Sequence, residues 1–151
     1  MIHLFLLQVV LSFFWGNAQR EYRDWTVYGG GPESIRYSRL DQINRANVRQ
    51  LREVWRYDTG DAFEGSEMQC NPIVVQGLLY ATTPKLRVIA LEADTGKLRW
   101  SFNPHEGKEV KTRTRIRGLT HWQGRIYFAA RHLLYCLDAK TGKLVESFGS
   151  K

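Results

Sequence analysis

Histidines and acidic residues are the first candidates for chemistry in this chain. The four histidines are His3, His105, His121 and His132, and their separations match no metal-ligand pattern. The sequence also contains no cluster of Asp, Asn and Glu with the spacing of a calcium-binding loop. We therefore predict that His105 and His121 are loop and strand-face residues rather than ligands, and that this chain has no metal site of its own.

Polar side chains at two further places can bind a ligand. Arg117 precedes Gly118-Leu119-Thr120, and a guanidinium presents forked donors that suit a carboxylate. Its position alone is equally compatible with a surface arginine ahead of a strand. Glu67 and Gln69 are two residues apart, so in an extended segment both side chains face the same way.

A glycine run at Gly29-Gly30-Gly31, followed by Pro32, predicts a loop. A loop that cradles phosphate needs a strand before it, a helix after it, and further glycines or a Gly-Lys-Ser/Thr ending. The sequence offers none of these around the run, so we exclude a nucleotide site there.

Two stretches share one pattern, which indicates an internal repeat. Val88 to Trp100 read VIALEADTGKLRW, and 46 residues further on Leu134 to Glu146 read LYCLDAKTGKLVE. Each has an alternating apolar strand, an acidic residue that can accept hydrogen bonds from turn amides, a Thr-Gly turn and a second strand. Units of this size rarely bury an apolar face without neighbours, so we predict a repeat protein. Glu146 replaces the tryptophan, which removes a large apolar contact from the second repeat.

The pattern of each repeat predicts four short antiparallel strands, which is the architecture of a propeller blade. The predicted strands are residues 72–75, 78–82, 87–91 and 98–102 in the first repeat, and 118–122, 126–130, 133–137 and 144–148 in the second. An alternating segment at 53–57 carries Trp55, which precedes Trp100 by 45 residues. We interpret this segment as the last strand of an incomplete earlier repeat.

The chain divides into four parts. Residues 1–18 are almost wholly apolar and end in Gly-Asn-Ala, which predicts a secretory signal cut after Ala18, with an uncleaved anchor as the alternative. Residues 19–70 form an N-terminal segment with the strand of the incomplete blade, 71–103 a first blade, and 104–151 a second blade at which the chain stops. Within the N-terminal segment, 41–51 favours a short turn or helix with an apolar side formed by Ile43, Val48 and Leu51.

Charge and cysteine content narrow the class of protein. The net charge is +7, but the Lys and Arg residues are spread over turns and strand ends, so we predict no nucleic-acid partner. Export permits disulfides, yet Cys70 and Cys136 fall at non-equivalent places in the repeats. We predict that both remain small buried apolar residues without a disulfide.

The first repeat resembles a known family. Residues 90–100, ALEADTGKLRW, are similar to the tryptophan-docking motif A-x-D-x-x-x-G-x-x-x-W of pyrroloquinoline-quinone (PQQ) dehydrogenases, with Glu92 in place of the Asp. The motif positions are Ala90, Glu92, Gly96 and Trp100. Further likeness lies in DWTVYGG at 24–30, RYSRLDQIN at 36–44, NPIVVQG at 71–77 and RGLTHW at 117–122. The segment from 83 to 91 looks nearer to the glucose-dehydrogenase branch than to the methanol branch.

The resemblance implies an all-β fold, an incomplete β-propeller of about two of the family's eight four-stranded blades. It implies that Arg117 contacts PQQ, and that Gln69 or Glu67 approaches the quinone where the family has a glutamate. The cysteine pair of the methanol branch would fall near residues 111 and 112 and is absent. Thr112, Arg113 and Arg115 are then candidates to line that region, with a solvated basic loop as the alternative.

In function, the resemblance implies an exported, periplasmic or secreted dehydrogenase that oxidises a sugar or alcohol and passes electrons to ubiquinone or a cytochrome c. The calcium ligands and the catalytic aspartate of the family would come from later blades, so we predict no catalytic residue in this chain and no activity of the chain alone. The alternatives are a noncatalytic propeller scaffold of the outer-membrane assembly type, and a two-blade protein that closes a ring by oligomerising.

Overall fold

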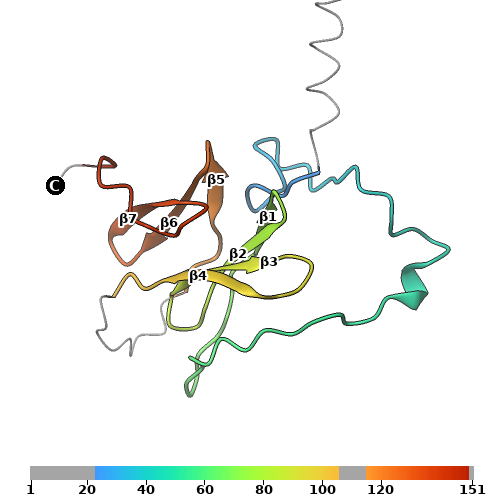
Figure 1. Cartoon of the computed structure of the whole chain (residues 1–151), viewed down its shortest axis with the longest axis horizontal. Helices are drawn as coiled ribbons and strands as arrows, with labels where there is room; N and C mark the ends of the chain where they lie inside the picture. The colour runs from blue at the N-terminus through green and yellow to red at the C-terminus, as the bar shows by residue number, and fades with distance from the viewer. Residues whose placement is uncertain (1–22, 106–114, 150–151) are drawn as a thin grey trace, which may run out of the picture.

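The computed structural model describes residues 23–105 and 115–149, and it is all-β (Figure 1). The predicted signal at 1–18 and the candidates Thr112 and Arg113 lie outside the described residues. The strands form two antiparallel sheets that lie side by side, as the prediction of successive propeller blades requires.

The first sheet is a four-stranded meander in the order β1-β2-β3-β4. Its strands are β1 (Ile73–Val75), β2 (Leu78–Thr82), β3 (Val88–Glu92) and β4 (Leu98–Phe102), within a residue of the predicted bounds. The β1–β2 connection is the two-residue Gln76-Gly77 turn, with φ of 51° and 79°. Positive φ at both central residues matches the twist of a tight hairpin, and the prediction of this turn is confirmed.

The second sheet has three strands in the order β5-β6-β7 rather than the predicted four. They are β5 (Thr120–Trp122), β6 (Arg125–Ala130) and β7 (Leu133–Asp138). The expected fourth strand at 144–148 pairs with β7 only through an isolated bridge between Leu144 and Leu137. The chain then turns, because the Phe148 amide donates to the Val145 carbonyl, and this closes the segment on itself.

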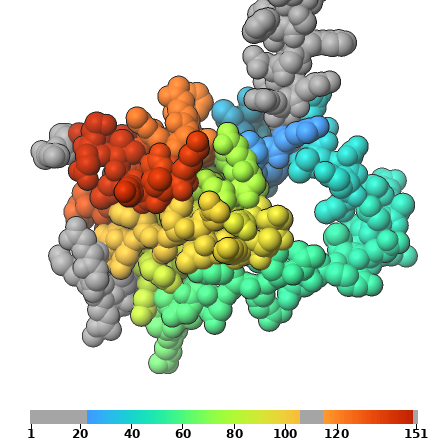
Figure 2. All heavy atoms as spheres, viewed as in Figure 1, coloured from blue at the N-terminus to red at the C-terminus, as the bar shows by residue number. Residues whose placement is uncertain are grey.

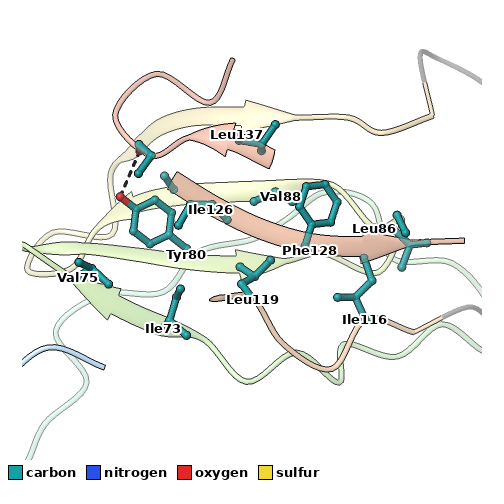
Figure 3. Packing of buried hydrophobic residues seen from close by; sticks show 13 residues of the cluster. Ile73, Val75, Tyr80, Leu86, Val88, Ile116, Leu119, Ile126, Phe128 and Leu137 are labelled. Carbon is teal, nitrogen blue, oxygen red and sulfur yellow. Dashed lines mark hydrogen bonds between the residues drawn. The ribbon is translucent and has the colours of Figure 1, made fainter. Parts of the chain in front are cut away.

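The main core lies between the two sheets (Figure 3). It is built from fully buried side chains of both, among them Ile73, Val88, Ile126 and Leu137. The Tyr80 hydroxyl crosses from β2 and donates to the Ala139 carbonyl at 3.2 Å, the bond drawn in Figure 3. The sheets are thus joined by apolar burial and by a buried hydrogen bond.

The motif tryptophan fastens one sheet to the next. The Trp100 indole lies over Gly142 in the second sheet's Thr-Gly turn, so close that a Cβ on that glycine would sit 2.5 Å from Cε3 of the ring. The indole N–H donates to the Ala139 carbonyl at 3.0 Å. A side chain at Gly142 is excluded both by this approach and by its φ of 70°, which explains why the motif needs glycine.

The N-terminal segment departs from prediction in two respects. Residues 53–57 are extended but form no ladder with any described strand. Within 41–51 only a 3₁₀ turn, η1 (Val48–Gln50), forms, and the expected apolar side is exposed, with Ile43 60% accessible. Figures 1 and 2 show this part of the chain running out from the sheets and back, and Val48 and Leu51 are also exposed.

Candidate functional site

The segment after residue 23 joins the first strands of the two sheets. Trp25 exchanges two backbone hydrogen bonds with Val74 of β1, at 2.7 and 2.9 Å. The next residue, Thr26, accepts the His121 amide of β5 at 2.8 Å. The DWTVYGG segment therefore lies against both β1 and β5, and this holds the loop that follows it beside their starts.

The starts of β1 and β5 also contact each other directly. Asn71 and Gly118 form a parallel bridge, and the Asn71 amide N–H donates to the Arg117 carbonyl at 2.9 Å. The Asn71 side chain donates to the same carbonyl at 3.1 Å. Beside this contact lies a hollow of about 360 Å³, and its described lining residues are Tyr28, Asn71, Arg117 and Gly118.

Arg117 supplies the positive charge at this hollow. Its backbone is held by Asn71, whereas its side chain is exposed. Within 23–105 and 115–149, no hydrogen bond or ion pair engages its guanidinium. Tyr28, also at the hollow, is held by Arg36, whose guanidinium donates to the Tyr28 hydroxyl at 3.0 Å and stacks over its ring. A fixed phenol and an exposed guanidinium thus border one open space.

Glu67 and Gln69 do face the same way, as predicted, and they contact each other. The Gln69 amide donates to Glu67 at 2.6 Å. Arg115 forms a two-point pair with the same carboxylate, Nη2 to Oε1 and Nε to Oε2, both at 3.0 Å. The Glu67 charge is therefore balanced within the chain. Neither Glu67 nor Gln69 is among the described lining residues of the hollow.

The structure therefore divides the predicted candidates. Arg117 stands at the hollow, Glu67 and Gln69 form a separate cluster with Arg115, and a role for any of them toward a cofactor stays a prediction. Sequence reasoning assigned no role to Tyr28 or Asn71, although both lie in the motifs quoted for the resemblance, DWTVYGG and NPIVVQG. The position of Tyr28 and Asn71 within those motifs is the sequence signal that could have identified them as residues of the hollow.

The acidic residues of the two repeats hold their turns by different bonds. Asp138 accepts the Thr141 amide and hydroxyl, both at 2.8 Å, and these bonds lower the pKa of its carboxyl. Glu92 accepts the Thr95 hydroxyl at 2.8 Å and the Arg99 guanidinium at 3.1 Å, and these bonds lower the pKa of Glu92. Glutamate is one methylene longer than aspartate, and the Glu92 carboxylate accepts from side-chain donors instead of turn amides. The predicted hydrogen bond from a turn amide is therefore seen at Asp138.

The described lining of the hollow contains no histidine and no cysteine. His121 lies on β5 and His105 follows β4 in a loop. Burial lowers the pKa of both imidazoles. Among the described residues no group of three or more His, Cys, Asp and Glu is placed to hold a metal ion. Cys136 is buried and Cys70 half-buried, both as free thiols.

The adjacent antiparallel sheets, joined by a tryptophan on a glycine turn, match part of a quinoprotein propeller. A family model described as glucose/ethanol/alcohol dehydrogenase, beta-propeller domain, matches residues 25–151. The chain belongs to this family of PQQ-dependent dehydrogenases.

Residues 23–105 and 115–149 contain no helix of the length and hydropathy that a bilayer requires.

Individual relatives agree with this assignment. The dehydrogenase subunit of a quinone-type alcohol dehydrogenase from Gluconobacter oxydans is 44% identical over 82% of this chain and 17% of its own length. The quinoprotein glucose dehydrogenase of Escherichia coli is 30% identical over 85% of the chain and 19% of its length. The solved quinohemoprotein alcohol dehydrogenase of Comamonas testosteroni superposes with a TM-score of 0.68 at 32% identity, covering 83% of this chain and 19% of that one. The chain thus spans about a fifth of the relatives it matches.

Proposed function

We propose that this chain is the part of a PQQ-dependent dehydrogenase that supplies one cationic contact to the quinone cofactor, in an enzyme that oxidises an alcohol or a sugar. The observation that carries the proposal is the exposed Arg117 guanidinium at the hollow where β1 and β5 begin. The 44% identity to an alcohol dehydrogenase, against 30% to a glucose dehydrogenase, favours an alcohol as the substrate.

The residues at the hollow fit PQQ, a planar quinone with several carboxylates. Among the residues that the structure describes, none engages the Arg117 guanidinium, and its planar fork of donors suits a carboxylate or paired quinone oxygens. The Tyr28 hydroxyl adds a polar group in a fixed position. None of the described lining residues of the hollow carries a carboxylate, which suits an anionic cofactor. Bound PQQ supplies hydride acceptance, and the described residues supply charge and orientation.

The wider setting is also part of the proposal. Residues 1–18 would direct export to the periplasm, and other blades would hold calcium and the catalytic aspartate. Ubiquinone or a cytochrome c would accept the electrons, and the chain alone would not turn over substrate. These statements rest on the resemblance and on the composition of the first eighteen residues.

Equilibrium dialysis of PQQ against the full chain tests the proposed contact. Arg117→Ala should weaken binding by roughly tenfold to a hundredfold, since it removes a charge-assisted hydrogen bond worth about 1.5–3 kcal/mol. Arg125→Ala is the matched control, because it removes the same charge from an exposed position at the start of β6. Equal losses in the two variants would show that only net charge attracts PQQ and would refute a site at Arg117.

The same experiment separates the scaffold alternative. A noncatalytic propeller needs its blades and no quinone contact, so it would take up no PQQ in wild type or in either variant. Catalysis is tested separately by adding PQQ, calcium and alcohol or glucose to the purified chain with a dye as electron acceptor. Dye reduction that depends on substrate would contradict the proposal that this chain is inactive alone.

A further inference from the structure

The loop of residues 28–36 folds back on itself beside the hollow. The Arg36 amide donates to the Gly29 carbonyl at 3.0 Å, and the Ser34 amide donates to the Gly31 carbonyl at 2.9 Å. Ser34 and Arg36 have φ of 53° and 54°, in the left-handed region that residues with a Cβ rarely adopt. A Cβ on Gly29 would sit 2.6 Å from the Ser34 Cα, so only glycine permits this close return. The loop therefore brings its last residue back to its first.

The returning end of the loop places a guanidinium on the Tyr28 ring. Arg36 Nη2 donates to the phenol oxygen at 3.0 Å, and Arg36 Cζ lies 5.2 Å from the ring centroid. Because a guanidinium can only donate, the phenol oxygen is the acceptor in this bond. The phenol O–H is left to donate elsewhere, and among the residues that the structure describes none accepts from it. Arg36 thus holds the ring and leaves its hydroxyl as a donor.

The Tyr28 hydroxyl and the Arg117 guanidinium are two donors at one hollow. Together they suit the oxygens of an anion such as a carboxylate. Arg36 is not among the described lining residues, so it reaches the hollow through Tyr28. We propose that Arg36 is a positioning residue, which holds the Tyr28 phenol so that its O–H donates to a ligand carboxylate beside Arg117. This inference rests on the proposed function, because the ligand is PQQ.

A double-mutant cycle in PQQ affinity, measured by equilibrium dialysis on the full chain, tests the proposal. Tyr28→Phe removes the donor and should weaken binding about tenfold. Arg36→Ala leaves the phenol unheld and should weaken binding about fivefold. The double variant should lose about tenfold, as Tyr28→Phe does alone, because Arg36 has no effect without the hydroxyl. Arg49→Ala removes the same charge from an exposed position in η1 and should change the affinity by less than about twofold.

Two readouts separate this positioning role from a role in folding. Arg36→Lys keeps a cationic donor for the phenol, so it should bind PQQ at least about threefold more tightly than Arg36→Ala. The ¹³Cζ NMR signal of Tyr28 is assigned as the tyrosine signal that Tyr28→Phe lacks. It should shift on addition of PQQ in wild type and in Arg36→Lys, and much less in Arg36→Ala. Amide spectra of β1 and β5 show that each variant keeps its sheets.

The possible failures are distinguishable. Losses from Tyr28→Phe and Arg36→Ala that multiply in the double variant would show that Arg36 acts without the hydroxyl, and would overturn the proposal. So would equal losses in Arg36→Ala and Arg49→Ala, since only net charge would then matter. If Arg117→Ala weakens PQQ binding and Tyr28→Phe does not, the phenol contact is wrong and the proposed function stands. If wild type binds no PQQ, both are wrong.

Discussion

Substitution of Gly142 by alanine tests the tryptophan dock where its geometry is tightest. A Cβ there would lie 2.5 Å from Cε3 and 2.6 Å from Cδ2 of Trp100, so the indole must shift. The φ of 70° adds backbone strain of about 1 kcal/mol for a residue with a Cβ. Loss of the indole hydrogen bond adds about 1 kcal/mol. Displaced ring packing contributes about 1 kcal/mol more, for a total near 3 kcal/mol.

Gly124→Ala is the matched control for that prediction. Gly124 has a φ of 74° in the same sheet, and a Cβ there would meet nothing within 4 Å. It should cost only the backbone strain of about 1 kcal/mol. The two free energies of unfolding are measured by urea denaturation followed by far-UV circular dichroism. Equal destabilisation by the two substitutions would refute the conclusion that the indole contact requires glycine at position 142.

Three further predictions concern single side chains. Trp100→Phe should destabilise by about 1 kcal/mol through the lost indole hydrogen bond, whereas Trp122→Phe, at a 60% exposed position, should be nearly neutral in urea denaturation. Burial, aided by the negative charge of Asp138, raises the pKa of Tyr80 to about 12. Folding therefore favours the neutral phenol of Tyr80. The stability that this preference contributes is fully present below pH 10 and is lost as the pH rises toward 12. Between pH 9 and pH 11 wild type should lose about 1 kcal/mol that Tyr80→Phe does not lose. Burial alone would raise the pKa of Asp61, but hydrogen bonds from Thr83, Thr59 and Arg87 hold it below its ordinary 3.8. The stability that the Asp61 carboxylate contributes is therefore present above pH 4 and is lost as the pH falls below 4. Asp61→Asn should lower the free energy of unfolding by about 2 kcal/mol at pH 7. The variant should also lose less stability than wild type between pH 7 and pH 3, as measured by denaturation at both pH values.

Local patterns predicted the blade because its strands and turns are specified by adjacent residues. The Gln76-Gly77 turn and the Thr-Gly turn follow from short-range sterics, and the apolar runs of β2 and β3 predict burial. β3 is buried on both faces rather than alternating, because Val88 and Ala90 pack on one apolar cluster and Ile89 and Leu91 on the other.

The failures lie where partners distant in sequence decide the outcome. The segment at 144–148 has a strand-like composition, yet it makes one bridge with β7 and then turns at Phe148, with Glu146 in place of a docking tryptophan. The residues of 144–148 do not themselves determine whether another strand pairs with this segment. Residues 53–57 have the strand side chains but no described backbone partner, so the pattern indicated their place and could not supply their pairing.

The candidate site shows the same limit. Arg117 was singled out by a motif, but the balance of the Glu67 charge depends on Arg115, 48 positions further along the chain. The hollow also needs Tyr28, which reaches it because Trp25 pairs with β1 and Thr26 with β5. Such convergence follows from topology and cannot be derived from spacing alone.

Titration of the ¹⁵N-labelled chain with PQQ, followed by NMR, locates the quinone contact on the protein. We expect the chemical-shift changes to concentrate on the amides of Tyr28, Asn71 and Gly118 and on the side-chain Nε of Arg117. Changes centred instead on the exposed β5–β6 hairpin, or no changes at PQQ concentrations well above the protein, would contradict a quinone contact at Arg117.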